Sequence, residues 1–254
     1  MLTILGPAKT IDMSPHGVTE NHSTPLYLDQ AELLVDQLRG YSLAELKSLM
    51  KVSDKLATLT FERFAAWRKS CTAGEGQQAI LAFSGEVFNG LKARTLNEKD
   101  LLFAQEHVRI LSGLYGVLRP LDLILPYRLE MGTKMKNPGG SNLYEFWEAI
   151  IPEKIAGDTG KQNTGVLINL ASNEYFKSIQ PGTFPHKIIT PVFKEAQGSG
   201  FRNVTIYAKK ARGMMLRFII QNRINEPEYI KAFDEEGYYF NNDLSNQKEW
   251  VFCR

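Results

Sequence analysis

Short apolar runs alternate with amphipathic segments along this chain, and this alternation limits the fold more than any other feature. The runs LTIL (2–5) and QAILAF (78–83) are bounded by turn residues and predict buried strands. GVLINLASNEYFKSI (165–179) predicts a strand, a turn and a helix. Because the predicted strands and helices follow no regular βαβ period, we expect a mixed α/β or α+β fold, with a mixed sheet flanked by helices.

The remaining elements are predicted from caps, turns and apolar spacing. Ser42 and Glu45 form a capping box at the first of two short helices between 42 and 67. Further helices are predicted over 28–38 (ending at Gly40), 98–112 and 143–151. The segment 187–210 predicts a hairpin around a Gly/Ser turn, and the tail from 237 to 253 predicts a final pair of short strands.

Length and charge bound the possible functions. The 254 residues, 43% of them hydrophobic, are enough for a sizeable core, and without repeats or a linker we expect one domain over 1–254. The net charge of +2 means that any anion-binding surface must come from uneven charge distribution. Two cysteines, Cys71 and Cys253, indicate a reducing compartment. With no signal-peptide pattern and no run approaching the roughly 18–20 apolar residues of a membrane span, we expect a cytoplasmic protein that contacts no membrane.

The segment AKKARGMMLRFIIQNRI (208–224) has two faces when it is projected as an α-helix. One arc is apolar, and the other carries Lys209, Lys210, Arg212, Arg217 and Arg223. No Asp or Glu occurs from 196 to 225, whereas the tail that follows is acidic. A solvated helix usually mixes both signs of charge, so the basic arc indicates either a phosphate-binding face or a set of ion pairs with the acidic tail. These residues alone leave both interpretations open.

A second basic element surrounds the break LMKVSDKLA (49–57) between the two short helices. A helix–hairpin–helix binds duplex phosphate through backbone amides in such a hairpin, where Val52 can anchor the turn and Ser53 can cap the second helix. Its positive charge comes from Lys51, Lys55 and Arg63. However, the hairpin lacks the usual glycine, and Asp54 repels a phosphate. An ordinary corner between two helices is at least as consistent with this pattern.

Two other motifs hold charged side chains on constrained backbone. In LYGVLRPLDLILPYRLEMG (114–132), glycine and proline fix the chain around Arg119, Arg128 and Glu130, which suits either a ligand-binding loop or structural Arg–carboxylate pairs. GPAKT (6–10) places Lys9 and Thr10 directly after a strand, where α/β sheets often bind anions. The GxxxxGK[ST] spacing of a nucleotide-binding P-loop is absent.

Searches for catalytic and metal-binding motifs find little. The four histidines are scattered, without HExxH or CxxC spacing, and Ser172 has no GxSxG surroundings. We therefore assign no catalytic residue, no cofactor and no metal ligand from the sequence.

Four motifs together resemble the YaaA family of bacterial peroxide stress proteins. GPAKT, LSGLYGVLRPLDLILPYRLEMG, NLASNEYFK and YAKKARGMMLRFIIQNR occur in this order along essentially the whole chain, although Gly6 stands where the family usually has serine. The resemblance implies a cytoplasmic protein that limits damage from unincorporated iron and DNA oxidation. It also implies a single mixed α/β fold, and duplex DNA binding through a positive cleft and a helix–hairpin–helix-like element at about 42–67. It carries over no catalytic residue.

Two functions remain in competition, and the first is favoured. A monomeric, non-enzymatic protein would bind duplex or structured DNA through the basic arc (Lys209, Lys210, Arg212, Arg217, Arg223) and the hairpin (Lys51, Ser53, Lys55, Arg63). Alternatively, an enzyme acting on a nucleotide or damaged nucleic acid would form a pocket from Lys9, Thr10, Arg119, Arg128, Glu130, Ser172, Asn173 and Glu174. The scattered histidines argue against a third function, iron sequestration.

Overall fold

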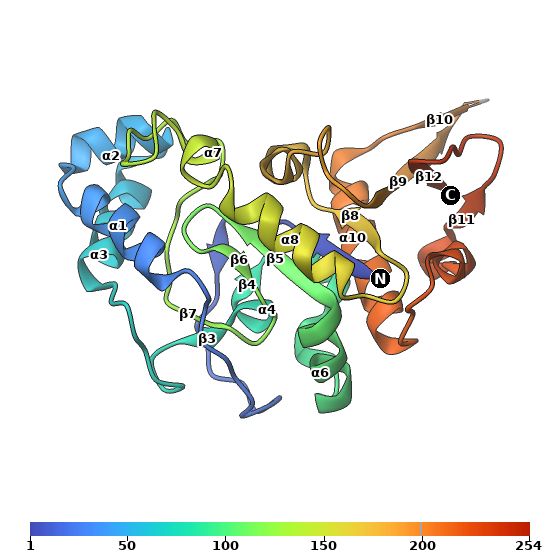
Figure 1. The fold of residues 1–254 in the computed structure, drawn as a ribbon, viewed down its shortest axis with the longest axis horizontal. Coiled ribbons are helices and arrows are strands. Elements are labelled where there is room, and N and C mark those ends of the chain that lie inside the picture. Colours follow the sequence, from blue (N-terminus) through green and yellow to red (C-terminus); the bar gives the residue numbers. More distant parts are fainter. Residues whose placement is uncertain (199) are drawn as a thin grey trace.

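The computed structural model describes residues 1–198 and 200–254, and an eight-stranded mixed sheet forms its centre (Figure 1). The sheet order is β11 (Tyr239–Asn241), β12 (Glu249–Cys253), β9 (Lys187–Gln197), β8 (Val166–Leu170), β1 (Leu2–Leu5), β5 (Val108–Ser112) and β6 (Gly116–Leu118), with β10 (Gly200–Arg202) paired to β9. From β12 to β5 the neighbours run parallel. The edge strands β11 and β6, and β10, are antiparallel to their partners. The predicted mixed α/β class is confirmed.

Helices surround this sheet. Their bounds are α1 (Leu28–Arg39), α2 (Leu43–Met50), α3 (Asp54–Ala66), α4 (Ala79–Ala82), α5 (Glu86–Leu91), α6 (Glu98–His107), α7 (Leu143–Phe146), α8 (Ile150–Gly160), α9 (Asn173–Phe176) and α10 (Thr205–Gln221). Short 3₁₀ segments lie at 93–95, 177–179, 227–232 and 235–237, and two-stranded ladders join β2 (Thr10–Ile11) to β4 (Phe83–Ser84) and β3 (Gln77–Gln78) to β7 (Leu123–Ile124). Within the described residues, every helix is too short or too polar to cross a bilayer.

Local sequence signals explain several of these elements. β1 is fully buried, as the run LTIL predicts, because a central parallel strand packs on both of its faces. The Ser42–Glu45 capping box forms at the start of α2. The hairpin of β9 and β10 forms within the predicted segment 187–210, although residues 205–210 belong to α10 instead of a strand. The predicted final pair of strands is β11 and β12.

Two predictions of secondary structure were wrong, and the helix predicted over 143–151 is interrupted at 147–149, between α7 and α8. QAILAF is not one strand: β3 is followed by the single-turn helix α4 and then by β4. Residues 79–83 are buried on every side, and an apolar run without periodicity does not distinguish a strand from a buried helix. The helix predicted over 98–112 ends at His107, and its last five residues are the central strand β5. The charge of Arg109 interrupts the apolar run that would have marked this strand.

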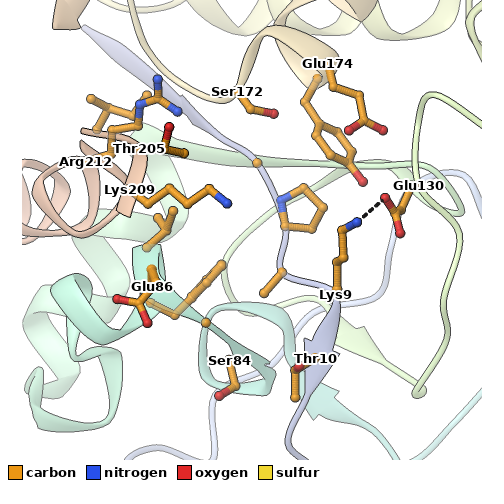
Figure 2. Close-up of a pocket in the computed structure, with 18 of the residues that line it drawn as sticks. Lys9, Thr10, Ser84, Glu86, Glu130, Ser172, Glu174, Thr205, Lys209 and Arg212 are labelled. Carbon is orange, nitrogen blue, oxygen red and sulfur yellow. Dashed lines mark ion pairs between the residues drawn. The ribbon is translucent and has the colours of Figure 1, made fainter. Parts of the chain in front are cut away.

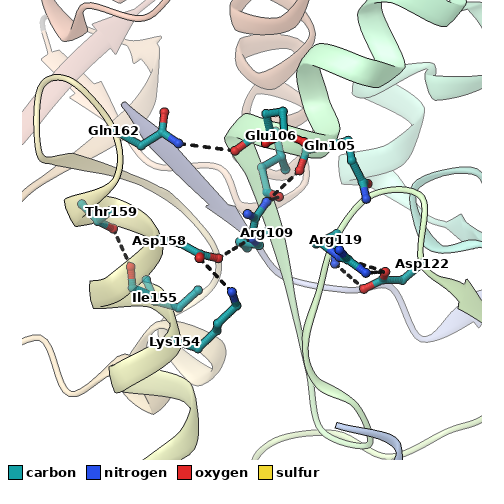
Figure 3. Close-up of polar contacts among 11 residues, drawn as sticks. Gln105, Glu106, Arg109, Arg119, Asp122, Lys154, Ile155, Asp158, Thr159 and Gln162 are labelled. Carbon is teal, nitrogen blue, oxygen red and sulfur yellow. Dashed lines mark hydrogen bonds and ion pairs between the residues drawn. The ribbon is translucent and has the colours of Figure 1, made fainter. Parts of the chain in front are cut away.

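Arg109 is accommodated in the sheet by a buried ion-pair network (Figure 3). Its Nε lies 2.7 Å from Oδ2 of Asp158 on α8, and Nζ of Lys154 lies 2.8 Å from the other carboxylate oxygen. Burial alone would raise the pKa of the Asp158 carboxyl, but the contacts from Lys154 and Arg109 outweigh it and lower that pKa. The network fastens α8 to β5.

The helices α5 and α10 cross in direct backbone contact, which glycine makes possible. A Cβ atom on Gly213 would lie 1.8 Å from the carbonyl oxygen of Val87, and one on Gly90 would lie 2.1 Å from the carbonyl oxygen of Lys210. No side chain fits between these backbones. The crossing therefore fixes the position of α10, including its first two turns.

Candidate functional site

A pocket of about 830 Å³, here called the switch-point pocket, opens where β1 and β8 end. The segments that follow these strands, 6–10 and 172–175, line it. β1 and β8 are parallel neighbours, but the next strand of the central sheet after β1 is β5 on one side, and the next after β8 is β9 on the other. Where connections diverge in this way, the carboxyl edge of a parallel sheet leaves a crevice that commonly binds ligands. The expected position of Lys9 and Thr10 beyond a strand end agrees with this geometry.

Three other segments complete the walls. They are residues 127–130, the turn from β4 into α5 (84–88) and the first two turns of α10. Figure 2 shows Lys209 and Arg212 on one side of the pocket, with Lys9, Glu130 and Glu174 on the opposite side. FSGEVFNGL (83–91) has two glycines but lacks the GxGxxG pattern, so its sequence is interpreted as tight turns and not as a binding segment. Its strand–turn–helix order, which NLASNEYF shares, was the signal for a third pocket segment.

One wall is a chain of alternating charges. The carboxylate of Glu130 forms two ion pairs, at 2.7 Å with Nζ of Lys9 and at 2.9 Å with Nη2 of Arg128. Nε of Arg128 is buried and has no hydrogen-bond partner among the described residues. Burial and, secondarily, repulsion from Arg128 lower the pKa of Arg63 on α3. Arg63 therefore lies near Arg128, although it does not itself line the pocket.

The five residues of the predicted basic arc, four of them on α10 and Arg223 just beyond its end, divide into two groups. Lys210 pairs with Glu236 at 2.5 Å, Arg217 donates to the carbonyl oxygens of Leu91 and Lys92, and Arg223 pairs with Asp100 at 2.8 Å. Lys209 and Arg212, in contrast, line the switch-point pocket without an ion pair or hydrogen bond in the described part of the chain. Burial lowers the pKa of Arg212, but a guanidinium keeps its charge near neutrality. Among the described residues that line the pocket, these two are the cations without an ion pair, whereas Glu86 on the same side and Glu174 on the opposite side are carboxylates without one.

The acidic tail accounts for one of these pairs. Glu236 belongs to the tail and meets Lys210. Asp100, the partner of Arg223, instead lies on α6, far upstream of the basic helix. The tail therefore does not neutralise the basic arc as a whole.

The side of the pocket formed by β8 and α9 carries oxygen atoms. Oε1 of Glu174 accepts a hydrogen bond of 2.8 Å from the amide of Gly132, and its second carboxylate oxygen has no partner among the described residues. Ser172, the residue before α9, makes no capping hydrogen bond through its side chain. Burial raises the pKa values of Tyr127 and Tyr175, so both phenols stay protonated at neutral pH. Acceptors thus face the cations of α10 across the pocket.

Arg119 does not join the other predicted pocket residues. Its guanidinium lies 2.9 Å from the buried carboxylate of Asp122 and also donates to the carbonyl oxygen of Thr24 (Figure 3). Of the two interpretations of this loop, the structural Arg–carboxylate pair is therefore the one that applies to Arg119. Arg128 and Glu130 also form a pair, but both line the pocket.

The hairpin between α2 and α3 has the expected local geometry. Lys51 ends α2 in a left-handed conformation with φ of 52°, and the hydroxyl of Ser53 caps α3 by accepting from the amide of Leu56. Nζ of Lys47 lies 2.7 Å from Oδ1 of Asp54. The positive charge of Lys47 therefore offsets the negative charge of the carboxylate that would otherwise repel a phosphate. Lys51 and Lys55 are exposed and form no ion pair within the described residues. Val52 is only half-buried, so it anchors the turn partially.

The surroundings of both cysteines disfavour the thiolate form. Burial raises the pKa of the Cys71 thiol and, likewise, that of Cys253. The thiolate is the reactive form, so a raised pKa slows attack on an oxidant. Among the described residues, no three His, Cys, Asp or Glu side chains gather in an arrangement that could hold a metal ion.

Comparison with known protein families gives a match over nearly the full sequence. The family model described as "Peroxide stress protein YaaA" matches residues 1–244. The matched span includes every segment that lines the switch-point pocket and both basic elements.

Proposed function

We propose that this chain, which belongs to the YaaA family of peroxide stress proteins, binds duplex DNA largely without regard to sequence. Binding uses the phosphate groups, which lie in a cleft between α10 and the segment 128–130 and are flanked by the hairpin of α2 and α3. Bound DNA is shielded there, which limits the base oxidation that free iron and peroxide cause together. The oxidative-stress role follows from the family, and DNA binding is the physical means proposed for it.

The observation that carries the proposal is the pair of unpaired cations, Lys209 and Arg212, on one side of the cleft. A cation without a protein partner is available to a phosphate, because no existing ion pair has to be broken before it binds. Each such contact also releases counterions from DNA, which is the main source of sequence-independent affinity. Lys210, Arg217 and Arg223 are engaged within the fold, so the proposal assigns DNA binding to Lys209 and Arg212.

The second basic element supports the same cleft. Arg63 and Arg128 lie close enough to repel each other, and a phosphate near both relieves that repulsion. Lys51 and Lys55 extend the positive surface along the exposed hairpin. A helix–hairpin–helix adds backbone amides to such contacts, because the first turn of its second helix has free N–H groups.

An enzymatic function has weaker support, although most of its predicted residues do share one pocket. The carboxylate of Glu130 is already engaged by two cations, Lys9 and Arg128, which suits a binding wall better than a catalytic group. Within the described residues, no side-chain base is hydrogen-bonded to Ser172 or Thr10, so the activated nucleophile of covalent catalysis is missing.

The experiment compares variants of the two unpaired cations with a variant of Lys210, the ion-paired lysine next to Lys209. Fluorescence anisotropy measures the affinity of wild type, Lys209→Gln, Arg212→Gln and Lys210→Gln for two labelled duplexes of unrelated sequence. We expect Lys209→Gln and Arg212→Gln to weaken binding to both duplexes by a similar factor, because phosphate contacts carry no sequence information. Lys210→Gln, the matched control, should bind nearly as wild type because its side chain is engaged by Glu236. Equal affinities for all four proteins would contradict the proposal.

A further inference from the structure

The unpaired cations of the switch-point pocket lie together on one side, beside the carboxylate of Glu86, and further hydrogen-bond acceptors lie on the opposite side. Lys209 and Arg212 supply unpaired positive charge from α10 (Figure 2). The second carboxylate oxygen of Glu174 and the side-chain amide of Asn173 lie on the opposite wall, and neither has a hydrogen-bond partner among the described residues. Apolar side chains, including Pro7 and Leu170, line the space between these groups. A ligand that fits must be anionic at one end and must donate hydrogen bonds at the other.

The size of the pocket excludes a bare phosphate as a full match. At about 830 Å³ it lies in the upper part of the range of roughly 300–1,000 Å³ that is usual for sites of small organic molecules. A phosphate would engage the α10 cations and leave the acceptors of Glu174 and Asn173 without a donor. A nucleotide satisfies both walls, since its phosphate is anionic and its base carries amino or imino donors on an apolar ring.

A base that is stacked in a duplex does not reach such a pocket. Proteins gain access to a base by rotating its nucleotide out of the helix, and this step costs least where the base is mismatched or damaged. The cleft proposed for the duplex phosphates is bounded by the same two residues, Lys209 and Arg212, that line the pocket. A nucleotide leaving the stack at that point would meet the pocket directly.

We propose that the switch-point pocket receives one nucleotide extruded from bound DNA. The inference rests on the proposed DNA binding and adds to it a preference for weakly paired bases. Lys209 and Arg212 hold the phosphate of the extruded nucleotide, and Glu174 and Asn173 accept hydrogen bonds from the polar edge of its base. No bond is made or broken. The consequence is tighter binding at mismatched or oxidised positions than on intact duplex.

The test uses a duplex that carries 2-aminopurine opposite an abasic site, because the emission of this base rises when it leaves the stack. Anisotropy of a terminal label reports binding separately. Thr205→Trp fills the pocket from the exposed first residue of α10, where a large side chain leaves the core intact. Gln221→Trp, at the exposed far end of the same helix, is the matched control. Glu174→Ala removes the acceptor without changing the cations.

We expect wild type and Gln221→Trp to raise 2-aminopurine emission several-fold on binding. Thr205→Trp and Glu174→Ala should bind intact duplex as wild type does, should lose most of the emission change and should no longer prefer the abasic duplex. Tight duplex binding by wild type with unchanged emission would overturn the extrusion proposal and leave DNA binding in place. An unaltered emission change in both pocket variants would overturn it too. A lack of duplex binding in the anisotropy channel would instead refute the proposed function.

Free nucleotides are the other source of the same chemistry. Titration with 2-aminopurine deoxyribonucleoside monophosphate measures this directly. We expect only weak binding, because the free nucleotide lacks the flanking phosphates. Saturable binding of the monophosphate that Thr205→Trp abolishes, together with an unresponsive duplex, would assign the pocket to free nucleotides and overturn extrusion.

Discussion

Replacement of Gly213 by alanine tests whether the crossing of α5 and α10 positions the binding residues. The new Cβ would lie 1.8 Å from the carbonyl oxygen of Val87, where ordinary contact begins at 3.4 Å. The obstacle is backbone, so no side-chain rotation relieves it, and the helices must separate by roughly 1.5 Å. A gap of even 0.5–1 Å forfeits about a quarter to a half of the dispersion energy of each contact.

These quantities give the expected change in the free energy of unfolding. Overpacking of this kind costs typically about 1–3 kcal/mol, and a backbone clash belongs at the upper end. Alanine recovers about 1 kcal/mol through its better helix propensity. We therefore expect Gly213→Ala to destabilise the protein by about 2 kcal/mol. Because Lys209 and Arg212 move with α10, duplex affinity should fall as well.

Urea denaturation followed by tryptophan fluorescence measures the change, and Gly157→Ala is the matched control. Gly157 is also a helical glycine, but a Cβ there would meet nothing within 4 Å. Alanine at this exposed position should stabilise the protein by about 0.5–1 kcal/mol. The two substitutions should therefore shift the urea midpoint in opposite directions. Equal stability of the two variants would refute the close contact between α5 and α10.

Three further predictions concern the fold and the thiols. Asp158→Asn leaves the buried Arg109 without its counterion, so urea denaturation should show a loss of about 3–5 kcal/mol, and a loss below 1 kcal/mol would contradict the buried network. Because the pKa of Asp158 is lowered in the folded state, its ionised carboxylate stabilises the fold above the unfolded aspartate pKa of about 3.9. This stabilisation disappears as the pH falls through the lower folded-state pKa. Asp158→Asn should therefore weaken the pH dependence of the free energy of unfolding in that acidic range. Ser42→Ala should cost about 1 kcal/mol through loss of the capping box, and an unchanged urea midpoint would show that the cap is unimportant. With thiol pKa values raised, Cys71 and Cys253 should be oxidised by peroxide no faster than free cysteine at neutral pH, as mass spectrometry of trapped sulfenic acid would show; faster oxidation would indicate a sensing thiol.

Local signals predicted the parts of the site that local chemistry determines. A strand followed by a turn placed Lys9 and Thr10 at a sheet edge, and the helical projection correctly separated the buried face of α10 from its basic face. Both depend on residues within a few positions of each other. The sequence could not rank the cations of that face, because their partners come from distant segments.

The adjacent lysines of α10 illustrate this limit. Lys209 and Lys210 are adjacent in the sequence, yet Lys209 lines the pocket and Lys210 pairs with Glu236. The difference arises when the acidic tail folds back along α10. Arg119 and Arg128 show the same dependence: both have a nearby carboxylate in one loop, but only Arg128 points to the pocket. No spacing rule distinguishes these cases before the sheet is assembled.

The salt dependence of duplex binding tests the central claim most directly. The logarithm of the association constant falls with the logarithm of salt concentration, with a slope of about −0.9 for each phosphate contact on B-DNA. We predict that the double variant Lys209→Gln, Arg212→Gln has a slope shallower by about 1.8 than that of wild type, which corresponds to two lost contacts. Lys210→Gln should keep the wild-type slope. Identical slopes for the double variant and wild type would contradict the claim that these two side chains of α10 bind DNA phosphates.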